Sequence, residues 1–230
     1  MTTRDLGQEG FVWFVGVVED RNDPLKLGRL KVRIYNIHSP KQSRMGTDEL
    51  PWATVMSPIS EANFNGTGYA PLGIQVGTTV VGFFMDGNDG NNPVIFGAIA
   101  GRTSEVSHDV PPEAREINNL NKAQLGPEPA SAYRAKYPYN KVLRTESGHV
   151  VEVDDTPNFE RIQIYHKSGS YIEINEEGRV VAKTVGDDFE IVAKNKEIFV
   201  KGNVNVKVDG TYTVESSGNM KFKAPKIELN

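Results

Sequence analysis

The stretch VKGNVNVKVDGTYTVESSGNMKFKA, residues 200–224, decides the fold of the C-terminal part of the chain. Its thirteen even positions hold nine apolar residues and three glycines, whereas its twelve odd positions are all polar or charged. A period of two is typical of a β-strand with one dry and one wet face, because a helix would spread these residues around its circumference. The pattern therefore predicts β structure with one apolar stripe, made of Val200, Val204, Val206, Val208, Tyr212, Val214, Met220 and Phe222.

Glycines punctuate this region at a spacing of eight residues. A single strand of this length would be unusual, since strands typically run for about 3–10 residues. Glycine allows a bend or a positive φ, so we expect strands of about five residues joined by glycine turns and wound about an axis as a β-helix. Residues 187–199 have a less regular parity, which predicts a local bulge there. The predicted turns are at Gly178, Gly186, Gly202, Gly210 and Gly218, with Lys194 in the skipped position.

One chain offers only this one narrow apolar stripe. Burying a valine side chain contributes roughly 1.5 kcal/mol or more, so the stripe needs a partner. Three identical chains wound together would bring their stripes onto a common axis and would leave few free strand edges. The pattern therefore predicts an obligate homotrimer with the eight apolar residues on its axis. An amyloid-like sheet is the disfavoured alternative, because the glycines and the charged odd face oppose it.

The N-terminal part of the chain holds five short runs rich in Val, Ile, Phe and Tyr, at residues 13–20, 29–36, 52–57, 78–85 and 93–100. Turn residues such as Asp23-Pro24 and Asp86-Gly87 bound these runs. Five short strands in about 100 residues predict a five-stranded OB-type barrel, with another small β-sandwich as the alternative. We expect an all-β protein with a barrel at 1–103, an extended linker packed on its neighbours at 104–140, and a needle at 141–230.

Composition excludes several classes of protein. The 230 residues include 26 Lys and Arg, 30 Asp and Glu and no cysteine, which gives a net charge of −4. This balance argues against nucleic-acid binding, and the missing cysteine excludes disulfides and thiolate sites. No apolar run is long enough to span a membrane, and the N-terminus lacks the apolar stretch of a secretory signal. Four barrel cations are expected to pair between subunits or to face a partner: Lys26, Arg29, Lys31 and Arg33.

The histidines offer one candidate metal site. The residues His149, Asp154, Asp155 and His166 are close in sequence, but no two histidines have the i, i+4 spacing of a helical site. We favour a turn at residues 154–157 and a surface charge pair between Glu160 and Arg161. No metal and no other cofactor is therefore expected.

Several long motifs resemble one family. The run WFVGVVEDRNDPLKLGRLKVRIYNIH, residues 13–38, resembles the start of the N-terminal OB domain in the central spike protein of contractile-tailed phage baseplates. Residues 50–60 and 77–101 are similar to its later strands. Residues 137–174 resemble the entry to the triple-stranded β-helix of that spike, which the valine-glycine-repeat spikes of type VI secretion share in outline.

The resemblance implies a trimeric spike in the tail baseplate of a virion. In that family the OB domains contact a hub ring, and the β-helix is a needle that punctures the cell envelope and touches it transiently. The spike of a type VI or extracellular contractile injection system stays open as an alternative. The sequence also ends in APKIELN, whose apolar Ile227 and Leu229 predict contact with a separate cap similar to the PAAR-repeat tip protein. The iron site that some spikes carry near the tip needs histidines, and none follows His166.

One departure from the family bears on catalysis. The best-known members carry a lysozyme domain between the barrel and the β-helix, whereas this chain has only residues 104–140 there. A glycosidase needs two carboxylates held across a sugar cleft, and this segment is too short to build one. We therefore expect no enzyme, with a peptidoglycan-degrading enzyme as the less favoured alternative. The acidic residues of the segment are expected to be solvated: Glu105, Asp109, Glu113, Glu116 and Glu128.

Overall fold

The computed structural model describes residues 11–62, 73–100 and 128–228. The chain divides into two compact units, Met1–Gly186 and Asp187–Asn230. The described residues contain ten strands and one short 3-10 turn, so the predicted all-β class is confirmed. No helix in the described part of the chain is long and apolar enough to cross a membrane.

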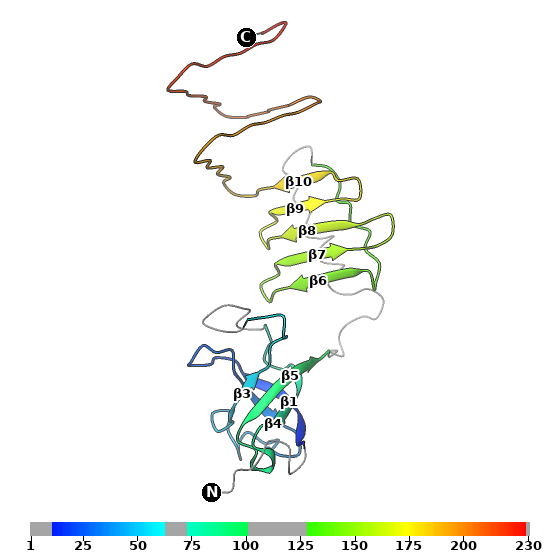
Figure 1. The fold of residues 1–230 in the computed structure, drawn as a ribbon, viewed down its shortest axis with the longest axis vertical. Helices are drawn as coiled ribbons and strands as arrows, with labels where there is room; N and C mark the ends of the chain where they lie inside the picture. Colours follow the sequence, from blue (N-terminus) through cyan, green and yellow to red (C-terminus); the bar gives the residue numbers. More distant parts are fainter. Residues whose placement is uncertain (1–10, 63–72, 101–127, 229–230) are drawn as a thin grey trace. The chain divides into compact units, whose positions relative to one another are not determined.

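The first five strands close into a barrel in the order β1-β2-β3-β5-β4 (Figure 1). All neighbouring pairs are antiparallel except β3 and β5, which are parallel. The predicted five-stranded barrel is therefore confirmed. The ends of each expected run differ by at most two residues from the ends of the observed strand. The strands are β1 (Trp13–Asp20), β2 (Leu30–Ile34), β3 (Trp52–Val55), β4 (Thr79–Phe84) and β5 (Pro93–Ile99), with the 3-10 turn η1 (Gly87–Asp89) between the last two.

Alternating side chains of these strands build the barrel core. The buried cluster consists of Phe14, Val18, Leu30, Val32, Ile34, Ala53, Val80, Phe84 and Ile95. The rings of Phe14 and Phe84 lie 5.0 Å apart between their centroids. Strand β2 is buried on both faces, because its outward side chains Lys31 and Arg33 are covered by residues 39–48.

The cations of the barrel correct one prediction. The guanidinium of Arg29 pairs with Asp23 at 2.7 Å, and that of Arg33 pairs with Glu19. Lys31 donates a hydrogen bond of 2.6 Å to the carbonyl oxygen of Asp48. All three side chains therefore bind partners within the same chain. The prediction that they pair between subunits or face a partner is wrong. The fourth cation, Lys26, is exposed and makes no ion pair with the described residues.

The next five strands form an antiparallel sheet in which sequence neighbours are also neighbours in space, in the order β10-β9-β8-β7-β6 (Figure 1). Short turns join the strands, and Gly148, Gly169 and Gly178 lie in them with positive φ angles of 91°, 99° and 78°. These glycines provide a backbone conformation that other residues adopt at a cost. The strands are β6 (Asn140–Arg144), β7 (Val150–Asp154), β8 (Arg161–Tyr165), β9 (Tyr171–Ile174) and β10 (Val180–Lys183).

Candidate assembly surfaces

The central strands of the sheet β6–β10 depart from the usual rule, because most of their charged residues are buried and most of their aliphatic residues are exposed. Strand β8 reads RIQIY, and its Arg161, Gln163 and Tyr165 are buried whereas Ile162 and Ile164 are exposed. Strands β7 and β9 follow the same alternation. One face of the sheet is therefore covered and holds the buried polar groups beside Val150, Tyr165 and Tyr171. The other face is open to water and largely aliphatic, with Lys141 on β6 opposite Val153.

The open face carries two columns of aliphatic side chains that the strand register aligns. In the first column, Val151 lies opposite Ile164, which lies opposite Ile172. In the second column, Val153 lies opposite Ile162, which lies opposite Ile174. We call this surface the apolar face. Its members are Leu143, Val151, Val153, Ile162, Ile164, Ile172, Ile174, Val180 and Ala182.

The covered face is built around the guanidinium of Arg161. It pairs with Glu152 and, at 3.0 Å, with Glu173, and it donates a hydrogen bond of 2.6 Å to Gln163 Oε1. Arg161 also lies 5.0 Å from the ring centroid of Tyr133. Burial raises the pKa of Glu152 despite the charge of Arg161. The predicted surface pair between Glu160 and Arg161 is therefore wrong, because Arg161 is buried among partners on β7, β8 and β9.

A strap of residues 128–139 covers this polar face. The hydroxyl of Ser131 and the backbone N–H of Ala132 both donate to Glu173, at 2.9 and 3.2 Å. Glu128 accepts hydrogen bonds from Lys183 and from the hydroxyl of Tyr171, and its side chain is largely buried, so the prediction that it is solvated is wrong. Burial and this hydrogen bond raise the pKa of Tyr171 to about 12. By covering this face, the strap excludes water from the polar side of the sheet and leaves the aliphatic side exposed.

Residues 187–228 contain no paired strand, and every side chain of this described segment is exposed. The backbone bends at 185–186, 193–194, 201–202, 209–210 and 217–218, which is a regular spacing of eight residues. A bend therefore falls at each predicted glycine turn from Gly186 on and also at Lys194. Gly178 turns with a positive φ, whereas the four later glycines do not. The eight residues of the predicted axis lie between the bends and are exposed, so their place on an axis stays a prediction.

The residues of the candidate metal site do not form a ligand group. The rings of His149 and His166 lie 4.4 Å apart, but Asp154 bonds to Thr156 and Asp155 pairs with Lys141. Within the described residues, no three His, Asp or Glu side chains lie together as metal ligands. Several residues named from the sequence lie outside the described residues: Glu105, Asp109, Glu113, Glu116 and Leu229.

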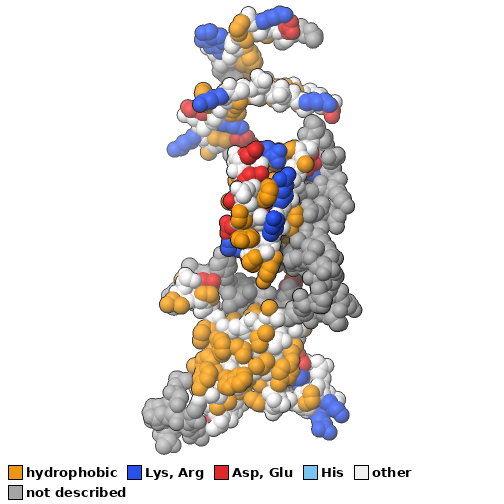
Figure 2. All heavy atoms as spheres, turned by 90° about the vertical axis from the view of Figure 1, so that its right-hand side faces the viewer, with side chains coloured by type: hydrophobic (Ala, Val, Ile, Leu, Met, Phe, Trp, Pro, Cys, Tyr) orange, Lys and Arg blue, Asp and Glu red, His pale blue; other side chains and the backbone are white. Residues whose placement is uncertain are grey.

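The barrel presents an exposed aromatic patch on β1, β4 and β5 (Figure 2). The rings of Phe11 and Phe83 lie 5.2 Å apart, and those of Phe83 and Phe96 lie 6.3 Å apart. Trp13 lies opposite Phe83 in the register of β1 and β4, and it is also exposed. A patch of this kind is typical of a surface that binds protein.

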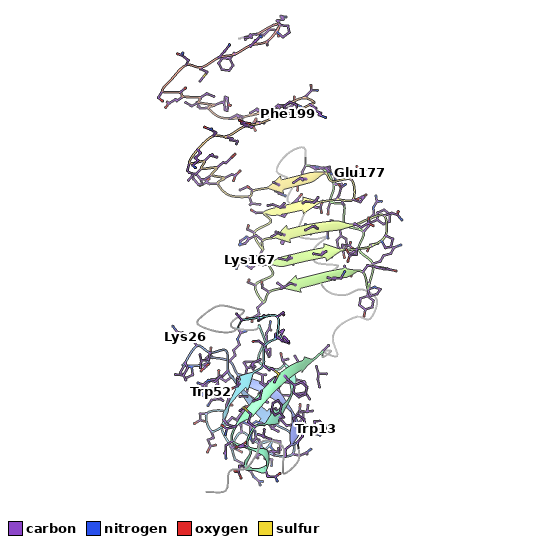
Figure 3. All side chains as sticks on the ribbon, in the orientation of Figure 1. Trp13, Lys26, Trp52, Lys167, Glu177 and Phe199 are labelled. Carbon is purple, nitrogen blue, oxygen red and sulfur yellow. The ribbon has the colours of Figure 1, made fainter. Side chains whose placement is uncertain are left out.

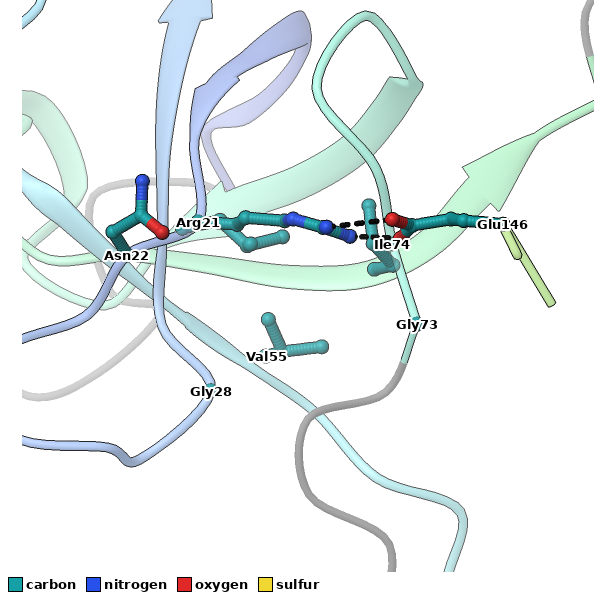
Figure 4. Close-up of a pocket in the computed structure, with 8 residues that line it drawn as sticks. Arg21, Asn22, Gly28, Val55, Gly73, Ile74 and Glu146 are labelled. Atoms are coloured by element: carbon teal, nitrogen blue, oxygen red, sulfur yellow. Dashed lines mark hydrogen bonds and ion pairs between the residues drawn. The ribbon is translucent and has the colours of Figure 1, made fainter.

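A pocket of about 390 Å³ lies beside the barrel strands β2 and β3 (Figure 4). Arg21 and Glu146 are joined by an ion pair at this pocket. Its lining residues are Arg21, Asn22, Gly28, Leu30, Val55, Gly73, Ile74 and Glu146. This lining combines a few aliphatic groups with a paired cation and carboxylate, and it holds no catalytic pair of carboxylates.

Sequence reasoning missed the apolar face and the strap. A signal was present, because residues 151–154 and 161–164 alternate aliphatic with charged or amide side chains. This alternation predicts a two-faced sheet, but it does not say which face is buried. The answer depends on residues 128–139, which have no periodic pattern of their own.

Comparison with known proteins identifies the family. The family model of the Gp5 N-terminal OB domain matches residues 36–111. Protein Gp5 of Vibrio phage KVP40 is 35% identical over 283 aligned positions, which cover 94% of this chain and 67% of that protein. The pre-baseplate central spike protein Gp5 of Enterobacteria phage T4 is 44% identical over 98 positions, which cover 40% of this chain and 17% of that protein.

The chain spans about two thirds of the KVP40 protein and a much smaller share of the T4 protein. The 283 aligned positions also exceed the 230 residues of this chain. The KVP40 protein therefore holds residues inside the aligned stretch that have no counterpart here. The family model matches part of the barrel, and the sequence similarity to the KVP40 protein extends over nearly the whole of this chain. The chain therefore belongs to the Gp5 family of phage baseplate central spike proteins.

Proposed function

We propose that this chain is a structural part of a phage tail baseplate, in which three copies form the central spike. The observation that carries the proposal is the apolar face of β6–β10, which one copy leaves open to water. Each aliphatic side chain buried there contributes roughly 1.5 kcal/mol or more, so a partner surface is strongly favoured. A cyclic three-fold contact between identical chains supplies such a surface from the same residues.

Residues 187–228 of the predicted needle also expose apolar side chains that need a partner surface. Its bends recur every eight residues, and the side chains of its even positions from Val200 to Phe222 are apolar and exposed. Three such chains wound together would pair their backbones and bury their stripes. The resulting rod is stiff because its backbone groups are bonded, and its charged outer side chains keep it soluble. Contraction of the tail would drive this rod through the cell envelope.

Two protein partners complete the proposed spike. The barrel attaches to a hub ring, and its exposed aromatic patch supports a protein-binding role. A PAAR-like tip protein covers the C-terminal end, where Ile227 is exposed. The net charge of −4 favours protein partners over nucleic acid.

The role proposed here is mechanical and not enzymatic. The chain has too few residues between the barrel and the strap for a separate glycosidase domain, and the pocket beside β2 and β3 lacks a pair of carboxylates. We expect no loss of turbidity when the purified protein is added to peptidoglycan. Both curated relatives are phage proteins, which favours a virion over a type VI or extracellular injection system.

The trimer is tested by light scattering on the full chain and on the variant Ile164→Lys. Ile164 lies at the centre of the apolar face, between Val151 and Ile172. We expect the wild type to have three times the chain mass of 25.4 kDa, and the variant to lose this assembly. A lysine placed on a buried apolar face would bring an unpaired charge out of water.

A matched control is Ile59→Lys, because Ile59 is a fully exposed isoleucine in a barrel loop. This variant should keep the mass of the wild type. A wild-type monomer would reject both the intertwined needle and the puncturing role, and an Ile164→Lys trimer would reject the apolar face as the contact.

A further inference from the structure

The charged side chains of residues 201–224 repeat with the same period as the bends. The bends recur every eight residues and divide this stretch into three repeats. From one repeat to the next, the charge at the seventh position changes sign twice, and the charge at the first position changes sign once. The residues at these corresponding positions are Lys201 and Asp209, and Lys207, Glu215 and Lys223.

Contacts within one copy leave these charges largely unused. Beyond Phe199 the chain runs as a single open trace with its side chains spread around it (Figure 3). Lys207 lies 3.6 Å from Asp209, but the two side chains are 86% and 91% exposed. The other three charged side chains are exposed and form no ion pair with a described residue. Any strong pairing must therefore come from outside the single chain.

The proposed trimer brings successive repeats of different chains together. Each repeat ends at one bend, so it occupies one face of a three-sided rod before the chain passes to the next face. Three-fold symmetry places the same repeat of the three chains at one level, on three different faces. The second repeat of one chain then lies beside the first repeat of its neighbour, and the third repeat lies beside the second. This step rests on the trimer of the proposed function and specifies its contacts.

The apolar stripe alone does not fix how neighbouring repeats are aligned. Because side chains alternate with a period of two, a slip of two residues keeps the apolar side chains on the inner face. The charged outer face does distinguish the alignments. When corresponding positions lie side by side, residues 201–224 form three opposite-charge contacts and no like-charge contact.

Either slip of two residues loses this complementarity. In one direction, charged side chains would have to lie ten positions apart in the sequence, and no two outer charges of residues 201–224 do. In the other direction, Lys201 comes beside Lys207 and Asp209 comes beside Glu215, against a single opposite-charge contact. Opposite charges directly across neighbouring strands stabilise a sheet, and like charges destabilise it. The charges therefore favour one alignment over both slipped ones.

We propose that salt bridges between copies hold the three chains of the needle in this alignment. Lys207 of one chain pairs with Glu215 of a second chain, and that glutamate pairs with Lys223 of the third. Lys201 pairs in the same way with Asp209 of a neighbouring copy. We call these contacts the charge ladder. The partner is a second copy of this chain, because the complementary charges lie in the same sequence one repeat further on.

Pairs of cysteines test the alignment in the full chain, which has no cysteine of its own. Corresponding positions on neighbouring strands lie about 5 Å apart, within reach of a disulfide, whereas positions two residues out of line lie roughly 8 Å apart and beyond it. Asn205→Cys/Thr213→Cys leaves every charge in place and should oxidise to a covalent trimer on a non-reducing gel. The matched controls Asn205→Cys/Thr211→Cys and Asn203→Cys/Thr213→Cys report the two slipped alignments and should not form it.

Charge reversal tests the ladder itself. Glu215→Lys places three lysines in one column and should lower the melting temperature of the trimer by about 5 °C or more, with a smaller loss in 1 M salt. Lys207→Glu/Glu215→Lys/Lys223→Glu reverses every sign in the column and should restore the wild-type value. The matched control Glu197→Lys has uncharged Phe189 and Asn205 at its corresponding positions. It should melt within about 2 °C of the wild type.

The outcomes separate the ladder from the trimer. A wild-type trimer in which Asn205→Cys/Thr213→Cys does not crosslink would overturn the alignment. A triple variant that melts no higher than Glu215→Lys would overturn the salt bridges. Both results would leave the trimer standing. A wild-type chain that scatters light as a monomer would reject the trimer and the charge ladder together.

Discussion

At the scale of single residues, Gly82 in β4 has no room for a side chain. A Cβ atom there would lie 2.2 Å from the carbonyl oxygen of Val94 and 2.5 Å from Cζ of Phe14. The carbonyl belongs to the backbone of the neighbouring strand and cannot move away without disturbing the barrel. We expect Gly82→Ala to lower the free energy of unfolding by about 1–3 kcal/mol, measured by chemical denaturation. Gly97 in β5 is the control, because no atom lies within 4 Å of its Cβ position. Equal stability of the two variants would contradict this close contact.

Glu19 gives the barrel part of its sensitivity to acid. Hydrogen bonds from Arg33 lower the pKa of Glu19 to about 2, whereas a glutamate in an unfolded chain titrates near 4.3. Because the folded pKa lies below the unfolded one, the ionised carboxylate stabilises the fold above about pH 4, and this contribution is lost as the pH falls towards 2. Glu19→Gln should therefore lose less stability than the wild type between pH 4 and pH 2. Thermal melts across this range measure the difference, and parallel curves would count against it.

At the scale of elements, the buried charges of β7, β8 and β9 depend on one cation. Replacing Arg161 with Met would leave Glu152 and Glu173 buried without their counter-ion. Breaking a buried pair in this way typically costs about 3–5 kcal/mol. We expect that loss in denaturation of Arg161→Met, together with a partial recovery at lower pH, where protonation removes the uncompensated charge.

The control for this substitution is Arg144→Met, since Arg144 is an exposed arginine on β6. Its stability should change by less than about 1 kcal/mol. If Arg161→Met loses no more stability than the control, the ionic layer does not hold the three strands together.

The elements also show where prediction from sequence succeeds. The barrel strands were predictable because each run of β-branched and aromatic residues ends at turn residues such as Asp86-Gly87, where the observed η1 begins. The faces of β6–β10 were not predictable, since both Val151 and Glu152 lie in the same alternating pattern. Their burial is decided by the strap, a segment distant in sequence that was expected to be a linker.

At the scale of the whole molecule, the eight-residue spacing of the bends predicts which deletions the needle tolerates. Deleting residues 203–210 removes one whole repeat and keeps every later apolar residue on its face. Deleting residues 203–209 removes seven residues and moves all later side chains to the opposite face. We expect the first deletion to keep the proposed trimeric state and its thermal stability, and the second to lose the trimeric state, to melt at a lower temperature or to aggregate. Light scattering and thermal melts compare the two, and similar behaviour would contradict the repeat as the unit of the needle.

Because the aliphatic columns of β6–β10 are exposed in a single copy, correct assembly should depend on when and where the copies are synthesised. If three copies assemble as proposed, a newly made copy leaves those columns exposed to water until it meets two others. The rate at which three chains meet falls steeply as they are diluted. During that delay the exposed aliphatic columns favour non-specific association with other proteins and aggregation. Chains released together from neighbouring ribosomes on one messenger would meet before they disperse. The yield of correct spike should then follow the rate of translation on each messenger more closely than the total amount of chain in the cell.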